Sequence, residues 1–132
     1  MPQKELFEKI YTIADIFLYP TFSDTLGFAI LEAQSFGLPV IVQKTRSTHT
    51  IHETVQNGKT GFIIENLSAN ANKQLFTEEI IDGIILKTEE LITNSNLRDK
   101  MSHNCIREIK DEKFSIKNRN KILKRIYSEA LK

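Results

Sequence analysis

Three short apolar runs constrain the fold of this chain most strongly. They are residues 15–19, 40–42 and 62–64, and segments with the apolar spacing of helices separate them. Short buried strands that alternate with helices are typical of parallel sheets, in which a crossover helix joins successive strands. We therefore predict an α/β fold: a partial doubly wound, Rossmann-like parallel sheet of about three strands, with flanking helices and a helical C-terminus.

The helix predictions depend on apolar periodicity and on end signals. Apolar residues recur at helical spacing in residues 4–13 and 26–37, and Gly37 followed by Pro39 is a typical helix end. Three further helices are predicted after residue 76, beginning at the N-cap Thr77, after residues 94–96, and near Ser115.

Length and composition limit the classes of function. A chain of 132 residues forms one domain, and its net charge of +1 gives no indication of nucleic-acid binding. The single Cys105 cannot form an internal disulfide, and no apolar run approaches the roughly 20 residues of a membrane span. We expect a cytoplasmic protein. Residues 98–132 contain 11 Lys or Arg and 5 Asp or Glu. This basic surplus fits either a solvated helical face or peripheral contact with an acidic lipid surface.

The stretch from Ser23 to Glu32 joins the first apolar run to the helix that follows. Helix starts carry unpaired N–H groups and the positive end of the macrodipole, so an anion such as a phosphate can bind there. Asp24 and Glu32 bracket this helix start, about 12 Å apart along a helix axis. From spacing alone two interpretations stay open: a ligand site, or an ordinary N-cap or turn residue at Asp24 with a solvated Glu32.

Longer motifs surround these two acids. Residues 14–33 are ADIFLYPTFSDTLGFAILEA, residues 37–41 are GLPVI, and residues 53–64 are ETVQNGKTGFII. This ordered set resembles the C-terminal half of GT-B glycosyltransferases, specifically the retaining family 4 (group 1) enzymes. Their signature places Glu eight residues after an acid, preceded by "AD-apolar-P-S" and followed by "A-x-x-x-G-x-P-V-apolar" and "E-I-V-x-x-G-x-x-G-apolar". Residues 1–132 would then be the C-terminal portion of a nucleotide-sugar-binding domain.

The resemblance implies a role for each matching residue. Asp24, where the family more often has Glu, would be the catalytic acidic residue beside the donor sugar, and Glu32 would accept hydrogen bonds from the donor ribose. The further donor-binding residues would be those at the helix start: Thr25, Leu26, Gly27 and Phe28. The donor would be a UDP-, GDP- or ADP-sugar and the acceptor a glycan or a lipid-linked molecule, with no cofactor and no metal.

This chain departs from the family pattern in two ways. The loop at residues 43–50 has Arg46, Ser47 and Thr48 where the family usually has two glycines. The chain also begins just before the fourth strand of about six in such a domain. It would therefore lack the basic pair that clamps the diphosphate and the whole acceptor domain. We expect the hexosyltransferase site to be incomplete and the chain alone to be inactive.

An alternative interpretation stays open. The chain would be a catalytically inactive α/β interaction module that pairs with another chain carrying the missing half. In either case the strand from Asp15 would lie at an unprotected sheet edge, which predicts self-association through that edge.

Overall fold

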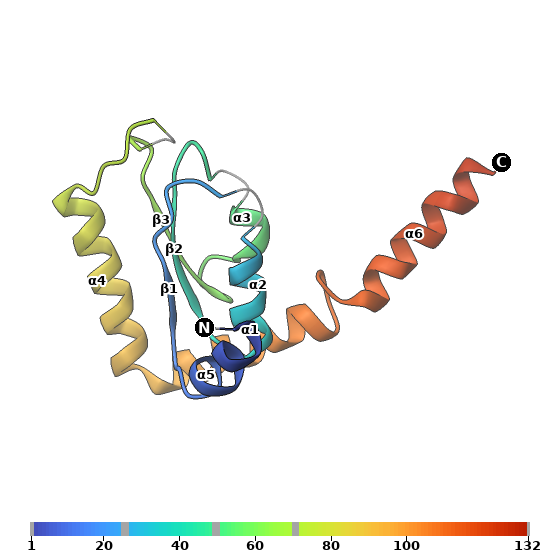
Figure 1. The fold of residues 1–132 in the computed structure, drawn as a ribbon, viewed down its shortest axis with the longest axis horizontal. Helices are drawn as coiled ribbons and strands as arrows, with labels where there is room; N and C mark the ends of the chain where they lie inside the picture. The colour runs from blue at the N-terminus through green and yellow to red at the C-terminus, as the bar shows by residue number, and fades with distance from the viewer. Residues whose placement is uncertain (1, 25–26, 49–50, 70–71, 132) are drawn as a thin grey trace.

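The computed structural model describes residues 2–24, 27–48, 51–69 and 72–131. Its centre is a parallel sheet with the order β1-β2-β3 (Figure 1). The strands are β1 (Phe17–Tyr19), β2 (Val40–Lys44) and β3 (Gly61–Glu65). Phe17 pairs with Val40, and Val40 pairs with Gly61, so all three strands begin at the same level. The predicted three-strand parallel α/β architecture is confirmed.

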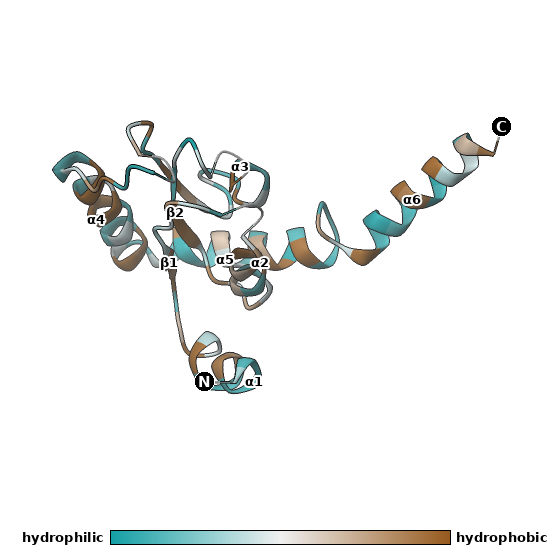
Figure 2. Ribbon diagram, turned by 45° about the horizontal axis from the view of Figure 1, so that its top comes forward, coloured by the Kyte–Doolittle hydropathy of each residue, from teal (hydrophilic) through white to brown (hydrophobic). Residues whose placement is uncertain are grey.

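Helices cover both faces of this sheet. α2 (Phe28–Ser35) and the short α3 (Ile51–Thr54) lie on one face, and α4 (Glu78–Thr93) lies on the other. α5 (Ser95–Lys110) passes across the end where the strands begin, beside α2. α6 (Ile116–Ala130) then projects away from the body, on the side opposite α4, in both views (Figures 1 and 2).

Alternate side chains of the strands fill two separate cores, as the period of two in a strand requires. Val40 and Val42 belong to the core beneath α2 and α3, together with Ile30 and Ile51. Ile41 and the β3 residue Phe62 belong to the core beneath α4 and α5, with Leu91 and Met101. A fully buried strand with apolar residues on both faces explains why residues 40–42 form a continuous apolar run.

The N-terminal segment forms two consecutive short helices rather than the single helix predicted for residues 4–13. They are α1 (Gln3–Leu6) and the π-helix η1 (Phe7–Tyr11). The ring of Phe7 lies 5.3 Å from that of Tyr11 and 5.3 Å from that of Phe36, at the end of α2. These aromatic contacts place the N-terminal segment beside α2, which is what brings Gln3 to the candidate site.

Caps fix the starts of the three long helices. The side chains of Thr77, Asn94 and Ser115 accept hydrogen bonds from the amides of Ile80, Leu97 and Asn118. Each bond satisfies one of the amides that a helix start leaves unpaired. The predicted N-cap at Thr77 and the helix start near Ser115 are confirmed.

The strand β1 is at the edge of the sheet, as predicted. α4 lies over β2 and β3, so the outward side chain of Leu18 on β1 remains 48% exposed. Among the residues that the structure describes, no helix is long and apolar enough to cross a membrane.

Candidate functional site

The turn that follows β1 is held by buried polar side chains from the ends of β2 and β3. Gln43 donates to the carbonyl of Pro20 at 2.9 Å, and Thr45 donates to the carbonyl of Phe22 at 2.9 Å. Asn66 in turn donates to the side-chain oxygen of Gln43 at 3.0 Å. Three loops thereby meet at the carboxyl ends of the strands, which is where open α/β sheets bind ligands.

Asp24 lies in this turn with both carboxylate oxygens engaged. Oδ2 accepts a hydrogen bond from the Tyr19 hydroxyl at 2.8 Å, and Oδ1 accepts one from the amide of Gly27 at 3.0 Å. Gly27 adopts a left-handed conformation with φ 71° and is the N-cap of α2, a backbone conformation that a side chain would strain. Asp24 is therefore not the N-cap of α2 but a turn residue whose carboxylate holds the amide of the N-cap Gly27. Its remaining lone pairs stay available for a ligand.

The hydrogen bond to the Asp24 carboxylate affects the pKa of Tyr19. Burial raises the pKa of the Tyr19 hydroxyl above its usual value of 10.0, and the hydrogen bond to Asp24 raises it further. Loss of the phenolic proton would leave two negative charges against each other, so Tyr19 stays neutral and donating at physiological pH. The pair joins the end of β1 to the turn that follows it.

Glu32 lies in the middle of α2, on the side next to the N-terminal segment. It is half-buried, and its Oε1 accepts a hydrogen bond from Gln3 Nε2 at 2.7 Å. The pKa of Tyr11 is raised mainly by the burial of Tyr11 and, to a smaller extent, by the negative charge of Glu32. Gln3 thus supplies one hydrogen bond to a partly exposed carboxylate.

The first turn of α2 provides the amides that were predicted to meet a diphosphate. Thr25 and Leu26 lie outside the described residues. The amide of Gly27 is already bonded to Asp24. Phe28, the first residue of the helix, has a side chain that is 71% exposed, so α2 is not buried at its N-terminus. The helix start is thus open to solvent beside Asp24.

The loop after β2 contributes a basic residue near this edge. Its backbone is anchored where the amide of Arg46 donates to the carbonyl of Ala69 at 3.2 Å, and the side chain of Arg46 is exposed. Lys44, at the end of β2, forms an ion pair with Glu65 on β3 at 3.7 Å. Within the described ranges no group of three or more His, Cys, Asp or Glu side chains is arranged to hold a metal ion.

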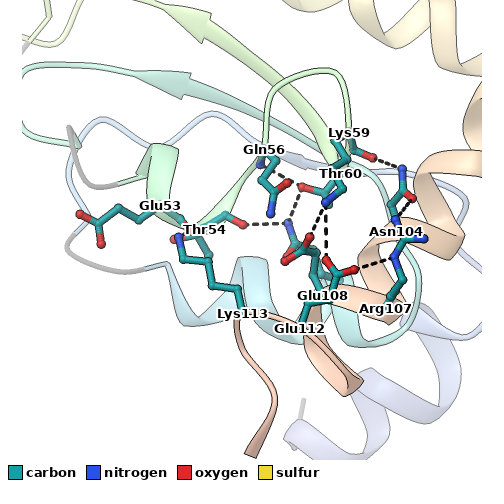
Figure 3. A network of polar contacts seen from close by, with 11 residues as sticks. Glu53, Thr54, Gln56, Lys59, Thr60, Asn104, Arg107, Glu108, Glu112 and Lys113 are labelled. Carbon is teal, nitrogen blue, oxygen red and sulfur yellow. Dashed lines mark hydrogen bonds and ion pairs between the residues drawn. The ribbon is translucent and has the colours of Figure 1, made fainter. Parts of the chain in front are cut away.

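A second polar network occupies the opposite end of the sheet (Figure 3). Lys59, in the turn before β3, contacts Glu108 of α5 at 2.6 Å, and Asn104 donates to the carbonyl of Lys59 at 2.9 Å. Glu108 is buried, which by itself would raise its pKa, but hydrogen bonds led by that from Lys59 hold the pKa below its usual value. This network joins α5 to the sheet and is structural, since it lies away from the ligand edge.

Sequence reasoning missed several residues that shape the site, among them Gln3, Gln43 and Asn66. Gln43 and Asn66 each stand at the end of an apolar run, where a polar side chain of a buried strand must find a partner. That position was the available signal. Nothing local to Gln3 predicts its contact with Glu32, because 29 residues separate them.

The sequence of this chain is similar to those of known glycosyltransferases. The family model described as glycosyl transferases group 1 matches residues 2–108. A capsular polysaccharide biosynthesis glycosyltransferase, CapM of Staphylococcus aureus, is 33% identical over 122 residues, 92% of this chain and 28% of its own length. The sulfoquinovosyl transferase SQD2 of Arabidopsis thaliana is 39% identical over 61 residues, 46% of this chain and 12% of its own.

Two solved structures share the fold. The glycosyltransferase WaaG, involved in lipopolysaccharide biosynthesis, superposes with a TM-score of 0.59 at 22% identity, over 80% of this chain and 25% of its own. The GtfA/B complex gives a TM-score of 0.59 at 20% identity, over 77% and 19%. This chain therefore spans about a quarter or less of the length of these relatives. Its GT-B-type fold and the match over residues 2–108 establish that the chain belongs to the group 1 glycosyltransferases.

Proposed function

We propose that this chain contributes the donor nucleotide-sugar site of a retaining hexosyltransferase that acts in glycan or glycoconjugate biosynthesis. The observation that carries the proposal is the open start of α2, with Asp24 before it and Glu32 in its middle, in a member of a glycosyltransferase family. Together these groups offer amide donors and a positive dipole for a diphosphate, with carboxylate acceptors on either side for sugar hydroxyls.

Each residue has a defined task in this proposal. Glu32 exchanges its hydrogen bond from Gln3 for bonds from the donor ribose. Asp24, held by Tyr19 and the amide of Gly27, directs its remaining lone pairs to the donor sugar, where positive charge develops at the anomeric carbon. The amides of residues 26 and 28, with Thr25, meet the diphosphate, and Gly27, whose own amide is held by Asp24, lets the ligand come close because it has no side chain.

The donor is a UDP-, GDP- or ADP-sugar, and it is a substrate rather than a cofactor. We propose a glycan or lipid-linked acceptor, which the capsular polysaccharide enzyme supports as a relative. The proposed compartment is the cytoplasm, with peripheral contact to the membrane where such an acceptor is lipid-linked. Because the chain spans about a quarter of that relative, the basic groups for the diphosphate and the acceptor site come from the rest of a complete transferase.

A titration monitored by ¹⁵N–¹H NMR tests donor binding, because it detects weak complexes. UDP-, GDP- and ADP-glucose are each added to the chain, and one of them is expected to shift the amides of residues 27–32 with a dissociation constant on the order of 1 mM. Glu32→Gln should weaken that binding about tenfold, the loss of one charge-assisted bond. Glu129→Gln, on the distant α6, is the matched control. No shift with any of the three donors would refute a donor site in this chain.

A second function is favoured by one specific observation. Asp24 and Glu32 are both satisfied within the chain, and β1 exposes Leu18 at the sheet edge. These facts suit an inactive α/β module that pairs with another chain, or with a second copy, through that edge. Mixing the chain with a polypeptide that carries the remainder of a group 1 transferase distinguishes the two functions. Restored transfer that Asp24→Ala abolishes supports the donor site, and restored transfer that this variant leaves intact supports the module.

A further inference from the structure

The loop after β2 is a tight turn whose backbone amides are engaged within the chain. The amide of Thr45 donates to the hydroxyl of Thr48 at 2.7 Å, and the amide of Thr48 donates to the carbonyl of Thr45 at 3.3 Å. The amide of Ser47 donates to the Thr45 hydroxyl at 3.1 Å, and that of Arg46 donates to the carbonyl of Ala69 at 3.2 Å. All four residues of this turn are described, and none of their amides remains for an anion.

This arrangement is the opposite of an anion-binding turn, in which successive amides point at the ligand. Where the group 1 family usually has two glycines, this chain has Arg46, Ser47 and Thr48. The two threonines that close the turn are buried, with Thr45 1% exposed and Thr48 0% exposed. An anion at this loop can therefore be held only by a side chain that reaches out of the turn.

Arg46 is the exposed cation of this turn. The hydroxyl of the preceding residue, Thr45, donates to the carbonyl of Phe22 at 2.9 Å. Phe22 lies two residues before Asp24, so this bond joins the base of the turn to the segment that leads into α2. Arg46 is thereby carried at the same edge of the sheet as the open start of that helix.

A guanidinium in this position suits a diphosphate. Arginine stays charged at physiological pH, and its planar fork of N–H donors can bind two phosphate oxygens at once. Lys44, the cation two residues earlier, is less available because it lies 3.7 Å from Glu65 and its side chain is 29% exposed. The backbone beneath Arg46 is already fixed by the bonds of the turn, which lowers the entropy that binding must cost.

We propose that Arg46 binds the diphosphate of the donor, so that this loop recognises the donor through a charged side chain instead of through backbone amides. The inference rests on the donor site proposed above and names a further specificity-determining residue in it. Arg46 adds to the basic groups that the rest of a complete transferase contributes. Donor binding to this chain should accordingly depend on the guanidinium and on ionic strength.

The NMR titration with UDP-, GDP- and ADP-glucose tests the proposal on the arginine side chain itself. The Nε–Hε signal of Arg46 is identified as the one that Arg46→Lys removes. It is expected to shift with the same donor that shifts the amides of residues 27–32. Arg46→Gln should raise the dissociation constant of that donor about tenfold, and Arg46→Lys, which keeps the charge but loses the fork, about threefold. Raising NaCl from about 50 mM to about 300 mM should weaken binding by a larger factor in the wild type than in Arg46→Gln.

Both substitutions keep the backbone amide that bonds to Ala69, and the side chain of Arg46 is exposed, so the fold should persist. Circular dichroism checks that it does. The matched control is Arg119→Gln, which removes the same charge from an exposed arginine of α6, the helix that projects away from the body (Figure 1). This control should bind the donor as tightly as the wild type.

Four results would overturn the proposal. An Nε–Hε signal that stays in place while the amides of residues 27–32 shift, or an Arg46→Gln variant that binds as tightly as the wild type, would leave the donor site intact and remove Arg46 from it. An equal loss of affinity in Arg119→Gln would assign the effect to net charge. No shift with any of the three donors would overturn this inference together with the proposed function.

Discussion

Removing the cation from the Lys59–Glu108 pair provides a quantitative test of the structure. Glu108 Oε1 lies 2.6 Å from Lys59 Nζ, and the Glu108 side chain is 3% exposed while that of Lys59 is 39% exposed. Taking away one partner of a fully buried pair costs about 3–5 kcal/mol, because the other charge is left uncompensated. Water reaches the partly exposed Lys59 side of the pair and screens the remaining charge, so the cost is smaller than for a fully buried pair. We expect Lys59→Met to lower the free energy of unfolding by about 1–2 kcal/mol at pH 7.

The pH dependence distinguishes this mechanism from a simple loss of packing. In the wild type the pKa of Glu108 is lowered from 4.5, so the pair's contribution is complete above that value and is lost as the pH falls through the lowered pKa. The pKa of Lys59 is raised, chiefly by the hydrogen bond to Glu108, so its contribution persists below the ordinary value of 10.5 and is lost only as the pH rises through the raised pKa.

Without the Lys59 cation, the hydrogen bond and charge that lower the pKa of Glu108 most are lost. Burial of the carboxylate, which acts in the opposite direction, then shifts that pKa upward. The native variant then takes up a proton before the unfolded chain does, and its stability relative to the wild type improves in acid. Urea unfolding followed by circular dichroism at pH 7, 5 and 3 measures the free energy of unfolding of the wild type and of Lys59→Met. The difference between the two should fall to less than about half of its pH 7 value at pH 3. Lys4→Met removes a cation from an exposed pair, with 85% and 64% of the side chains accessible, and should have no measurable effect. A difference that stays constant over this pH range would refute the reasoning.

Three further predictions concern the sheet, the turn before α2 and the buried thiol. Gly61→Ala would place a Cβ 2.0 Å from the carbonyl oxygen of Val40, so thermal unfolding should show a loss of about 2–4 kcal/mol. Gly58→Ala, with no atom within 4 Å but φ +77°, should cost about 1 kcal/mol. Asp24→Ala should bring the pKa of Tyr19 down toward 10.0, since its hydroxyl loses its acceptor, and ultraviolet titration of tyrosinate measures this. Burial raises the pKa of the Cys105 thiol to about 12, so iodoacetamide at pH 8 should label it only after unfolding.

The elements of the fold could be predicted because their signals are local. Residues 40–42 form an apolar run because β2 is buried on both faces, and Thr77 caps α4 through a bond to an amide three residues away. Each signal lies within the element that it specifies. The boundaries were less accurate: the first strand begins at Phe17 rather than Asp15, and the helix predicted from residue 26 begins at Phe28, after the left-handed Gly27.

The candidate site was only partly predictable, because its contacts join residues that are far apart in the chain. Motif similarity selected Asp24 and Glu32 as candidates, but it did not predict that Tyr19 and Gln3 bind them. Those two contacts depend on how β1 ends and on how α1 returns beside α2 through the aromatic cluster.

The partner of Glu32 determines what a donor must do to bind. The Gln3 amide already occupies one oxygen of that carboxylate, so a ribose must displace it or use the remaining lone pairs. Gln3 is exposed, and its release costs little because water can replace its amide as a donor to the Glu32 carboxylate. Gln3 thus acts as a replaceable substitute for a ligand hydroxyl, whereas the bonds of Asp24 to Tyr19 and Gly27 are part of the structure of the turn. Gln3→Ala should accordingly leave donor affinity unchanged or raise it about twofold to fivefold in the NMR titration, and a tenfold loss would show that Gln3 positions Glu32 instead.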